Sequence, residues 1–171
     1  MIDYNSITTL VQDRIGDLHQ TAEKRNLAIL ASNWAAIQTD YNRAMIKGRW
    51  YHFVSLLRGK SPKLIAFNDV YNQQMLKRQH ELGTCIVPID RIVGSMGRCT
   101  NFDRAFYPCK LTTRDRWTSI ARAYYETVAL PLVELYKVGE AYFVNDGHHR
   151  ISVAHAQGQR FIEAAVIEIE L

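Results

Sequence analysis

The chain has 171 residues, of which 47% are hydrophobic and 22% are charged, and its formal net charge is +4. This length and composition predict a soluble globular protein with a substantial hydrophobic core. No stretch approaches the roughly 18 uninterrupted apolar residues of a membrane span, so we expect no membrane insertion and a cytoplasmic location. Three cysteines without close spacing (Cys85, Cys99 and Cys109) indicate reduced thiols rather than a disulfide scaffold.

The excess positive charge lies in the first half of the chain. Residues 1–84 hold 11 Lys or Arg against 7 Asp or Glu, whereas residues 85–171 hold 10 of each. Between Arg43 and Arg78 the only acidic residue is Asp69, and the cations are Arg43, Lys47, Arg49, Arg58, Lys60, Lys63, Lys77 and Arg78. Such a cluster, with Trp50, Tyr51 and His52 interleaved, can follow a nucleic-acid backbone and stack on bases. A solvated helical surface, or a face for an acidic partner, is the alternative interpretation.

Helical periodicity dominates residues 1–84. Apolar residues from Ile7 to Met45 recur at helical spacing, which predicts one long helix, or two with a break near Asn26, ending at Gly48. A shorter helix is expected over residues 49–58, and another from Asn68 or Asp69 to Leu82, with Gly83 as its C-cap. The apolar stripe must be covered by the chain itself or by a second copy, so a homodimer through the N-terminal helix is one expectation.

Three large aromatic side chains in this half, Trp34, Trp50 and Phe53, are expected in a core or in an interface rather than in a cofactor site. From Thr84 the pattern changes to short β-branched runs. A strand over residues 85–93 has Pro88 at an edge or a bulge, and the glycine loop 94–98 follows it. Residues 101–113 read as irregular.

The remaining elements alternate helix and strand signals. A helix from Arg114 or Asp115 to Thr127 is followed by strands over 133–138 and 141–144, which Gly139-Glu140 joins as a hairpin, and by a last strand over 165–171. We therefore predict an α+β fold. A small mixed-sheet domain over residues 85–171 is preceded by an all-helical extension or subdomain over residues 1–84.

The most informative segment is Asp146-Gly147-His148-His149-Arg150, which separates an apolar strand from an Ala-rich helical pattern. A strand, tight turn and helix start in this order aim unpaired backbone N–H groups and the positive end of the helix dipole at one point. An anion, typically a phosphate, is stabilised there. Arg150 adds donors that fit phosphate oxygens, and the two histidines can donate or accept. The alternative is a plain turn in which Asp146 caps the helix and the histidines are polar surface.

This segment, with Ala154 and Gly158 after it, resembles the phosphate-binding motif of the ParB/sulfiredoxin superfamily. ParB partition proteins carry Gly-Glu-Arg-Arg at this place, and free serine kinases of the superfamily carry Asp-Gly-His-His-Arg itself. The resemblance extends from about Val87 to the end of the chain. Sulfiredoxin has its reactive cysteine where this chain has His148, so we do not expect sulfinic acid reduction.

The resemblance implies a ParB/sulfiredoxin-like sheet domain and a bound nucleotide, CTP, ATP or ADP, with Mg²⁺ where phosphate is transferred. It assigns ligand binding to the turn Gly147, His148, His149 and Arg150. If phosphate is transferred, the chemistry of the side chains suits Asp146 to orient a histidine or hold Mg²⁺ through water, and His148 or His149 to act as acid or base. Gly94, Ser95 and Arg98 of the glycine loop would form a second anion-binding element.

The kinases also need an upstream glutamate as general base. Between Asp90 and Arg122 this chain has only Asp103 and Asp115, and Asp103 is the better substitute. A metal site is not expected on His148 and His149, because adjacent helical residues point about 100° apart.

Two functions follow. The first is nucleotide or phosphate binding, which leaves open whether the protein is an enzyme that hydrolyses a nucleotide or transfers phosphate. The second is a DNA-associated module whose affinity comes from residues 43–78, through Arg43, Lys47, Arg49, Arg58, Lys60 and Lys63.

Overall fold

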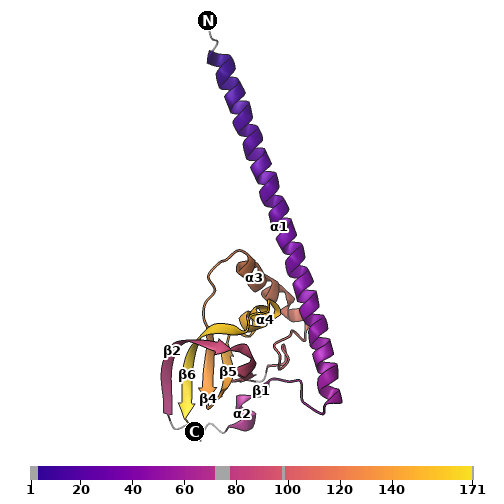
Figure 1. The fold of residues 1–171 in the computed structure, drawn as a ribbon, viewed down its shortest axis with the longest axis vertical. Helices are drawn as coiled ribbons and strands as arrows, with labels where there is room; N and C mark the ends of the chain where they lie inside the picture. Colours follow the sequence, from indigo (N-terminus) through magenta and orange to yellow (C-terminus); the bar gives the residue numbers. More distant parts are fainter. Residues whose placement is uncertain (1–3, 72–77, 98, 171) are drawn as a thin grey trace. The chain divides into compact units, whose positions relative to one another are not determined.

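The computed structural model describes residues 4–71, 78–97 and 99–170 and, within the first helix, the side chains of Arg14 and of residues from His19 on. The chain divides into two compact units, Met1–Ala36 and Ile37–Leu171. Helix α1 runs from Tyr4 to Leu57, so its residues belong to both units (Figure 1). Among the described residues, no helix has the length and apolar character that crossing a bilayer requires.

A six-stranded mixed sheet forms the centre of the second unit, in the order β1-β3-β5-β4-β6-β2 (Figure 1). Pairing is antiparallel between β5 and β4 and between β6 and β2, and parallel elsewhere. The strands are β1 (Ile65–Ala66), β2 (Arg78–Pro88), β3 (Ile92–Ser95), β4 (Val133–Val138), β5 (Ala141–Asp146) and β6 (Phe161–Glu170). The predicted α+β fold, a helical N-terminal part followed by a mixed sheet, is confirmed.

Two apolar clusters pack in this unit. Phe143 and Val144, neighbours on β5, belong to different clusters, because successive side chains of a strand point to opposite faces. Val144 packs in the main cluster with Ile151 of α4 and Trp117 of α3, and Phe143 meets Phe67 edge to face at 5.2 Å. The short helices are α2 (Phe67–Val70), α3 (Arg114–Tyr125) and α4 (His148–Ala156), with 3-10 turns η2 (Ile89–Arg91) and η3 (Leu111–Thr113).

Helix α1 continues through Gly48, so the predicted end at this glycine, with a separate helix after it, is wrong. A Cβ at Gly48 would lie 2.9 Å from the Cβ of Tyr107, which means that the glycine allows another segment to approach the helix closely. The side chains of Ile37 and Tyr41 are buried on this helix, and Tyr41 packs edge to face on Trp117 at 5.4 Å. One face of α1 between Ile37 and Met45 therefore forms part of the main core.

The opposite face of α1 is also apolar. Ile46, Trp50, Phe53 and Leu57 follow helical spacing and are 54–72% exposed. Trp34, in the first unit, is 51% exposed. Of the two roles expected for Trp34, Trp50 and Phe53, a place in the core is therefore wrong, and an interface stays a prediction.

The helix predicted from Asn68 or Asp69 to Leu82 is wrong. Helix α2 ends at Val70, residues 72–77 lie outside the described part of the chain, and β2 begins at Arg78. Gly83 does have positive φ (73°), but it lies at an irregularity of the β2–β6 ladder and caps no helix. The expected boundary between residues 84 and 85 falls inside β2. Pairing with β6 outweighs the weak helical pattern here.

Most elements predicted for the C-terminal half are present in the structure. The helix after residue 113 and the hairpin of β4 and β5 are confirmed, and the last strand begins earlier than expected, at Phe161. The predicted strand 85–93 is instead divided into β2, the 3-10 turn and β3.

Gly94 provides a test of the packing on the sheet. A Cβ at this position would lie 2.3 Å from the Ile65 carbonyl oxygen and 2.7 Å from the Phe143 ring, whereas a Cβ at Gly97 would meet nothing within 4 Å. We expect Gly94→Ala to lower the free energy of unfolding by about 1–3 kcal/mol or more, because the added methyl overpacks the site. Gly97→Ala is the control and should change it by less than about 0.5 kcal/mol. Urea denaturation measures both, and equal stabilities would contradict the packing described here.

Candidate functional site

The strand–turn–helix predicted around the Asp-Gly-His-His-Arg segment is confirmed. β5 ends at Asp146, Gly147 has φ of 106°, and α4 begins at His148. Glycine is required at this turn for two reasons. Other residues rarely adopt such a φ, and a Cβ here would lie 2.6 Å from Cγ1 of Val133. The N-cap residue of α4 is Gly147 rather than Asp146, whose carboxylate pairs with Arg150 instead.

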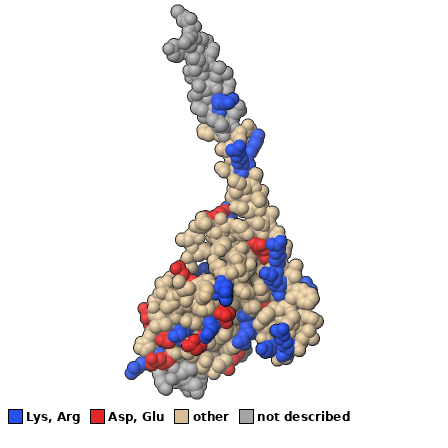
Figure 2. Space-filling view, in the orientation of Figure 1, with Lys and Arg blue, Asp and Glu red and all other residues tan. Residues whose placement is uncertain are grey.

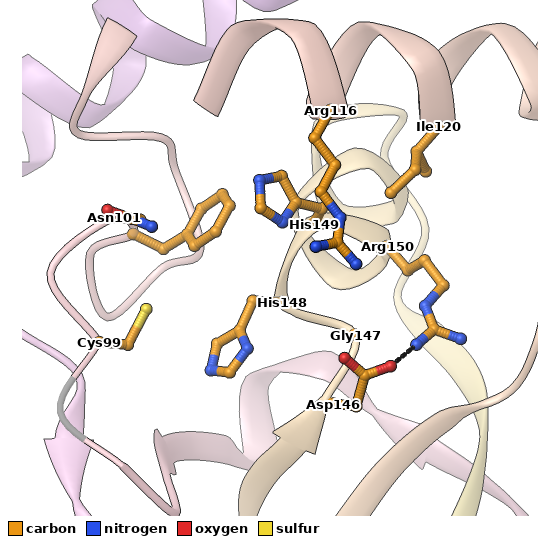
Figure 3. A pocket seen from close by; sticks show the side chains of 10 residues that line it. Cys99, Asn101, Arg116, Ile120, Asp146, Gly147, His148, His149 and Arg150 are labelled. Carbon is orange, nitrogen blue, oxygen red and sulfur yellow. Dashed lines mark hydrogen bonds and ion pairs between the residues drawn. The ribbon is translucent and has the colours of Figure 1, made fainter. Parts of the chain in front are cut away.

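A pocket of about 160 Å³ lies at the start of α4 (Figure 3). One wall is the turn itself, another comes from α3, and a third comes from the segment that follows β3. Its lining residues are Cys99, Asn101, Phe102, Arg116, Ile120, Asp146, Gly147, His148, His149 and Arg150. The first backbone N–H groups of α4 have no partner within the helix and are available at this pocket.

Arg150 is held by the protein itself. Its Nη1 donates to the carbonyl oxygens of Pro131 (2.5 Å) and Leu132 (2.6 Å), and its Nη2 forms an ion pair with Asp146 (Figure 3). The side chain is only 12% exposed. Arg150 therefore clamps the first turn of α4 to the segment before β4, and the phosphate contacts expected of it would compete with these bonds.

His148 is a poor anion donor for a similar reason. Its Nε2 lies 2.8 Å from Oγ of Ser95, whose single hydroxyl hydrogen is donated to the carbonyl oxygen of Val144. We assign the proton to Nε2, which then donates to Ser95 and leaves Nδ1 as an acceptor. Burial lowers the pKa of His148, although the charge of Asp146 opposes the shift. The ring is thus neutral near pH 7 and suited to accept a proton.

His149 packs edge to face on Phe102, with ring centroids 4.9 Å apart. Burial, the charge of Arg116 and the neighbouring His148 lower the pKa of His149 to about 4. Neutral His149 keeps one N–H that can donate to an anion, but it brings no positive charge to the pocket.

The positive charge of the pocket comes from Arg116, which extends from α3 beside His149 (Figure 3). Arg116 is exposed and, among the described residues, has no hydrogen-bond or ion-pair partner. Sequence reasoning did not select Arg116. It lies 30 residues before the turn, and only the packing of α3 against α4 brings the two together.

Two residues of the expected second anion-binding loop lie in a strand instead. Gly94 and Ser95 are buried in β3, where both pair with β1 and β5, so a loop at these residues is wrong. The sheet places Ser95 at the site nevertheless, as the partner of His148. Arg98 lies outside the described residues.

Asp103, the expected substitute for the kinase glutamate, does not line the pocket. It is 1% exposed, and burial raises its pKa to about 7, although backbone N–H groups of Tyr107 and Ala105 favour its charged form. Burial, with the charges of Asp103 and Cys99, also raises the pKa of the nearby Cys109 thiol to about 11. The neighbour of Asp103 in the sequence, Phe102, does reach the pocket.

Comparison of the chain with protein-family models, with curated proteins and with solved structures finds no significant match. The function is therefore argued from the geometry and charge of the site.

The pKa of His149 predicts a pH dependence of stability. An unfolded histidine, with a pKa near 6.5, binds a proton between about pH 6.5 and 4 that folded His149 does not bind. Stability contributed by neutral His149 is therefore lost as pH falls through this range. We expect His149→Gln to reduce the slope of the free energy of unfolding against pH in this range. The reduction is up to about 1.4 kcal/mol per pH unit, and it is smaller because solvent partly screens the site. Urea denaturation at several pH values measures it.

The exposed His19 supplies the matched control. His19→Gln should leave the decline as in the natural chain. A slope that His149→Gln does not alter would contradict a half-buried, neutral His149.

Proposed function

We propose that the pocket at the start of α4 binds the phosphate group of a nucleotide or of another small phosphorylated compound. The observation that carries this proposal is the exposed guanidinium of Arg116, without a partner among the described residues, beside the first turn of a nine-residue helix. Backbone N–H groups, a helix dipole and a free guanidinium are the groups that bind phosphate in proteins.

Charge favours an anion at this place. The ion pair with Arg150 neutralises Asp146, and the two histidines are neutral near pH 7, so Arg116 leaves the lining with a charge of about +1. The helix dipole adds roughly 0.3–1 kcal/mol for an anion at an exposed N-terminus. A charge-assisted hydrogen bond from a guanidinium contributes about 1.5–3 kcal/mol. Arg116 therefore supplies the larger share.

Size decides which part of a ligand fits. A volume of about 160 Å³ is well below the roughly 300–1,000 Å³ of pockets that enclose drug-sized ligands, so a phosphate fits but a whole nucleotide does not. A second hollow of about 310 Å³ shares Ile120 and Arg150 with the first and is lined by apolar side chains such as Leu132 and Val133. A nucleoside portion fits there. This supports CTP, ATP or ADP as ligands without distinguishing their bases.

Phosphate transfer or hydrolysis at this pocket would use the residues expected from the sequence in altered roles. His148, with Nδ1 left as an acceptor, would act as general base toward a hydroxyl or a water. Asp146 is 56% exposed on its side chain, so its carboxylate can hold the water shell of Mg²⁺. Arg116 would stabilise the charge that develops on the transferred group.

Arg116→Ala is the direct test. We expect it to weaken binding of inorganic phosphate, ATP and CTP by about 10- to 100-fold, because one charge-assisted contact of 1.5–3 kcal/mol is removed. Isothermal titration calorimetry with each compound, with and without Mg²⁺, measures this change. Arg122→Ala removes an equal charge from the same helix, where Arg122 pairs with Glu126 at the surface, and should bind as the natural chain does. Equal affinities in the two variants, or no binding by the natural chain, would refute the proposal.

Arg150→Ala separates the clamp from the binding group. Loss of its two backbone contacts and of the ion pair should lower the melting temperature, which differential scanning calorimetry measures. Arg116→Ala should leave that temperature unchanged.

Binding to DNA is a second candidate, supported by the surface of α1. The cations Arg43, Lys47, Arg49, Arg58, Lys60, Lys63 and Arg78 are all exposed. Figure 2 shows Lys and Arg side chains along the edge of the second unit that carries α1. Lys77 lies outside the described residues. Arg43 and Lys47 follow helical spacing on one flank of α1, next to the exposed Trp50, and Arg58 directly follows the end of this helix at Leu57. A homodimer through the apolar face of α1 stays a proposal on the same helix.

The salt dependence of DNA binding tests this candidate. The double variant Lys47→Ala with Arg58→Ala should reduce the slope of log affinity against log salt by about 2, because each lost phosphate contact removes roughly 0.9. Fluorescence anisotropy with a labelled duplex measures the slope. The double variant Arg91→Ala with Lys137→Ala removes the same charge from η2 and β4 and should leave the slope unchanged. A slope that falls equally in both would contradict binding along α1.

A further inference from the structure

A second group of reactive side chains lies in the same unit, outside the pocket. His52, Asp103 and Cys109 each offer one possible metal-ligand atom, and these three atoms lie within 4.8 Å of one another. His52 Nε2 is 3.6 Å from Cys109 Sγ and 4.0 Å from Asp103 Oδ2. His52 comes from α1, and the other two come from the segment between β3 and α3. Neither distance to the histidine describes a strong hydrogen bond.

Asp103 supplies an independent observation. Its side chain is fully buried, at 0% exposure. Oδ1 accepts hydrogen bonds of 2.9 Å from the backbone N–H groups of Ala105 and Tyr107. Oδ2, the oxygen that faces His52, has no hydrogen-bond partner among the described residues. A buried carboxylate oxygen without a partner is costly, so a cation at this place would satisfy it.

The backbone is arranged to bring these atoms together. Gly48 lies one helical turn before His52 on α1, and a Cβ there would lie 3.4 Å from Asp103 Oδ2 and 2.9 Å from the Cβ of Tyr107. Because this position has no side chain, the segment carrying Asp103 contacts the helix next to His52. Asp103 is also held by hydrogen bonding of its backbone N–H to the carbonyl oxygen of Tyr107.

We propose that His52, Asp103 and Cys109 bind a divalent transition-metal ion, and that this ion is Zn²⁺. A thiolate, an imidazole and a carboxylate together suit zinc, whereas Mg²⁺ and Ca²⁺ prefer oxygen ligands alone. Tetrahedral ligands at 2.0–2.3 Å from zinc lie roughly 3.3–3.8 Å apart. The two distances to His52, 3.6 and 4.0 Å, need shifts of only a few tenths of an ångström, and the separation of Cys109 from Asp103, which is within 4.8 Å, can need a larger one. With 39% of the His52 side chain exposed, water can complete the coordination.

Cobalt substitution tests this site in the full chain. Protein freed of metal by dialysis against a chelator is titrated with Co²⁺, then with Zn²⁺ against a chromophoric chelator. We expect one Co²⁺ per chain, a thiolate-to-cobalt charge-transfer band and visible bands of a tetrahedral ion, all displaced by Zn²⁺. Zn²⁺ should also raise the melting temperature of the natural chain.

Matched variants assign the ligands. Cys109→Ser should abolish the charge-transfer band. His52→Gln should lower Zn²⁺ affinity by more than about 100-fold, because even loss of a residue that only hydrogen-bonds to a metal ligand costs about 10- to 100-fold in affinity. Cys85→Ser and His80→Gln remove the same groups from β2 and should leave binding unchanged. His52 is partly exposed, so its variant tests the site even if substitution of Asp103 unfolds the chain; circular dichroism confirms folding.

Failure of the folded natural chain to bind Co²⁺ or Zn²⁺ stoichiometrically would overturn the proposal. A charge-transfer band that persists in Cys109→Ser, or that disappears in Cys85→Ser, would do the same.

Discussion

Arg150 holds the start of α4 in place. Its guanidinium forms an ion pair with Asp146 and donates hydrogen bonds to two backbone carbonyl oxygens before β4. The pair spans one turn at the start of α4, next to a glycine that no larger residue can replace without meeting Val133. The start of the helix is therefore held at one angle to the sheet. A guanidinium used in this way serves the fold, and the binding of an anion falls to other groups on the same pocket.

Those groups divide the chemistry of the pocket between charge and proton transfer. Burial keeps His148 and His149 neutral near pH 7, because an imidazolium ion would lose its hydration without gaining a carboxylate partner of its own. The guanidinium of Arg116 carries the positive charge and reaches the pocket from α3. An anion at this place would be attracted by a fixed charge, while the neutral ring of His148 remains able to accept a proton. This separation of roles supports the phosphate chemistry proposed for the pocket.

Local sequence patterns predicted the elements whose signals are local. The turn at Gly147, the β4–β5 hairpin and α3 each depend on residues that are close together in the chain. Glycines whose role depends on distant residues were misread. The sequence pattern predicts a helix end at Gly48, a helix cap at Gly83 and a loop at Gly94, whereas Gly48 and Gly94 allow a close approach and Gly83 lies at an irregularity of the ladder. Arg116 was missed for the same reason, since only tertiary packing brings it to the turn. A glycine in a sequence indicates an unusual backbone requirement, but the residue alone does not distinguish a positive φ from a close approach.

The segment between β3 and α3 joins the two groups of reactive side chains in one unit. Phe102 packs on His148 and His149, whereas the next residue, Asp103, is directed at His52. A bridge of Phe102 to Pro108 and a bridge of Lys63 to Asp103 hold both residues in place. Adjacent side chains on an extended backbone point in opposite directions, so the position of one constrains the other. Whatever fixes the buried carboxylate of Asp103 therefore also fixes the aromatic wall against which the two histidines of the pocket rest.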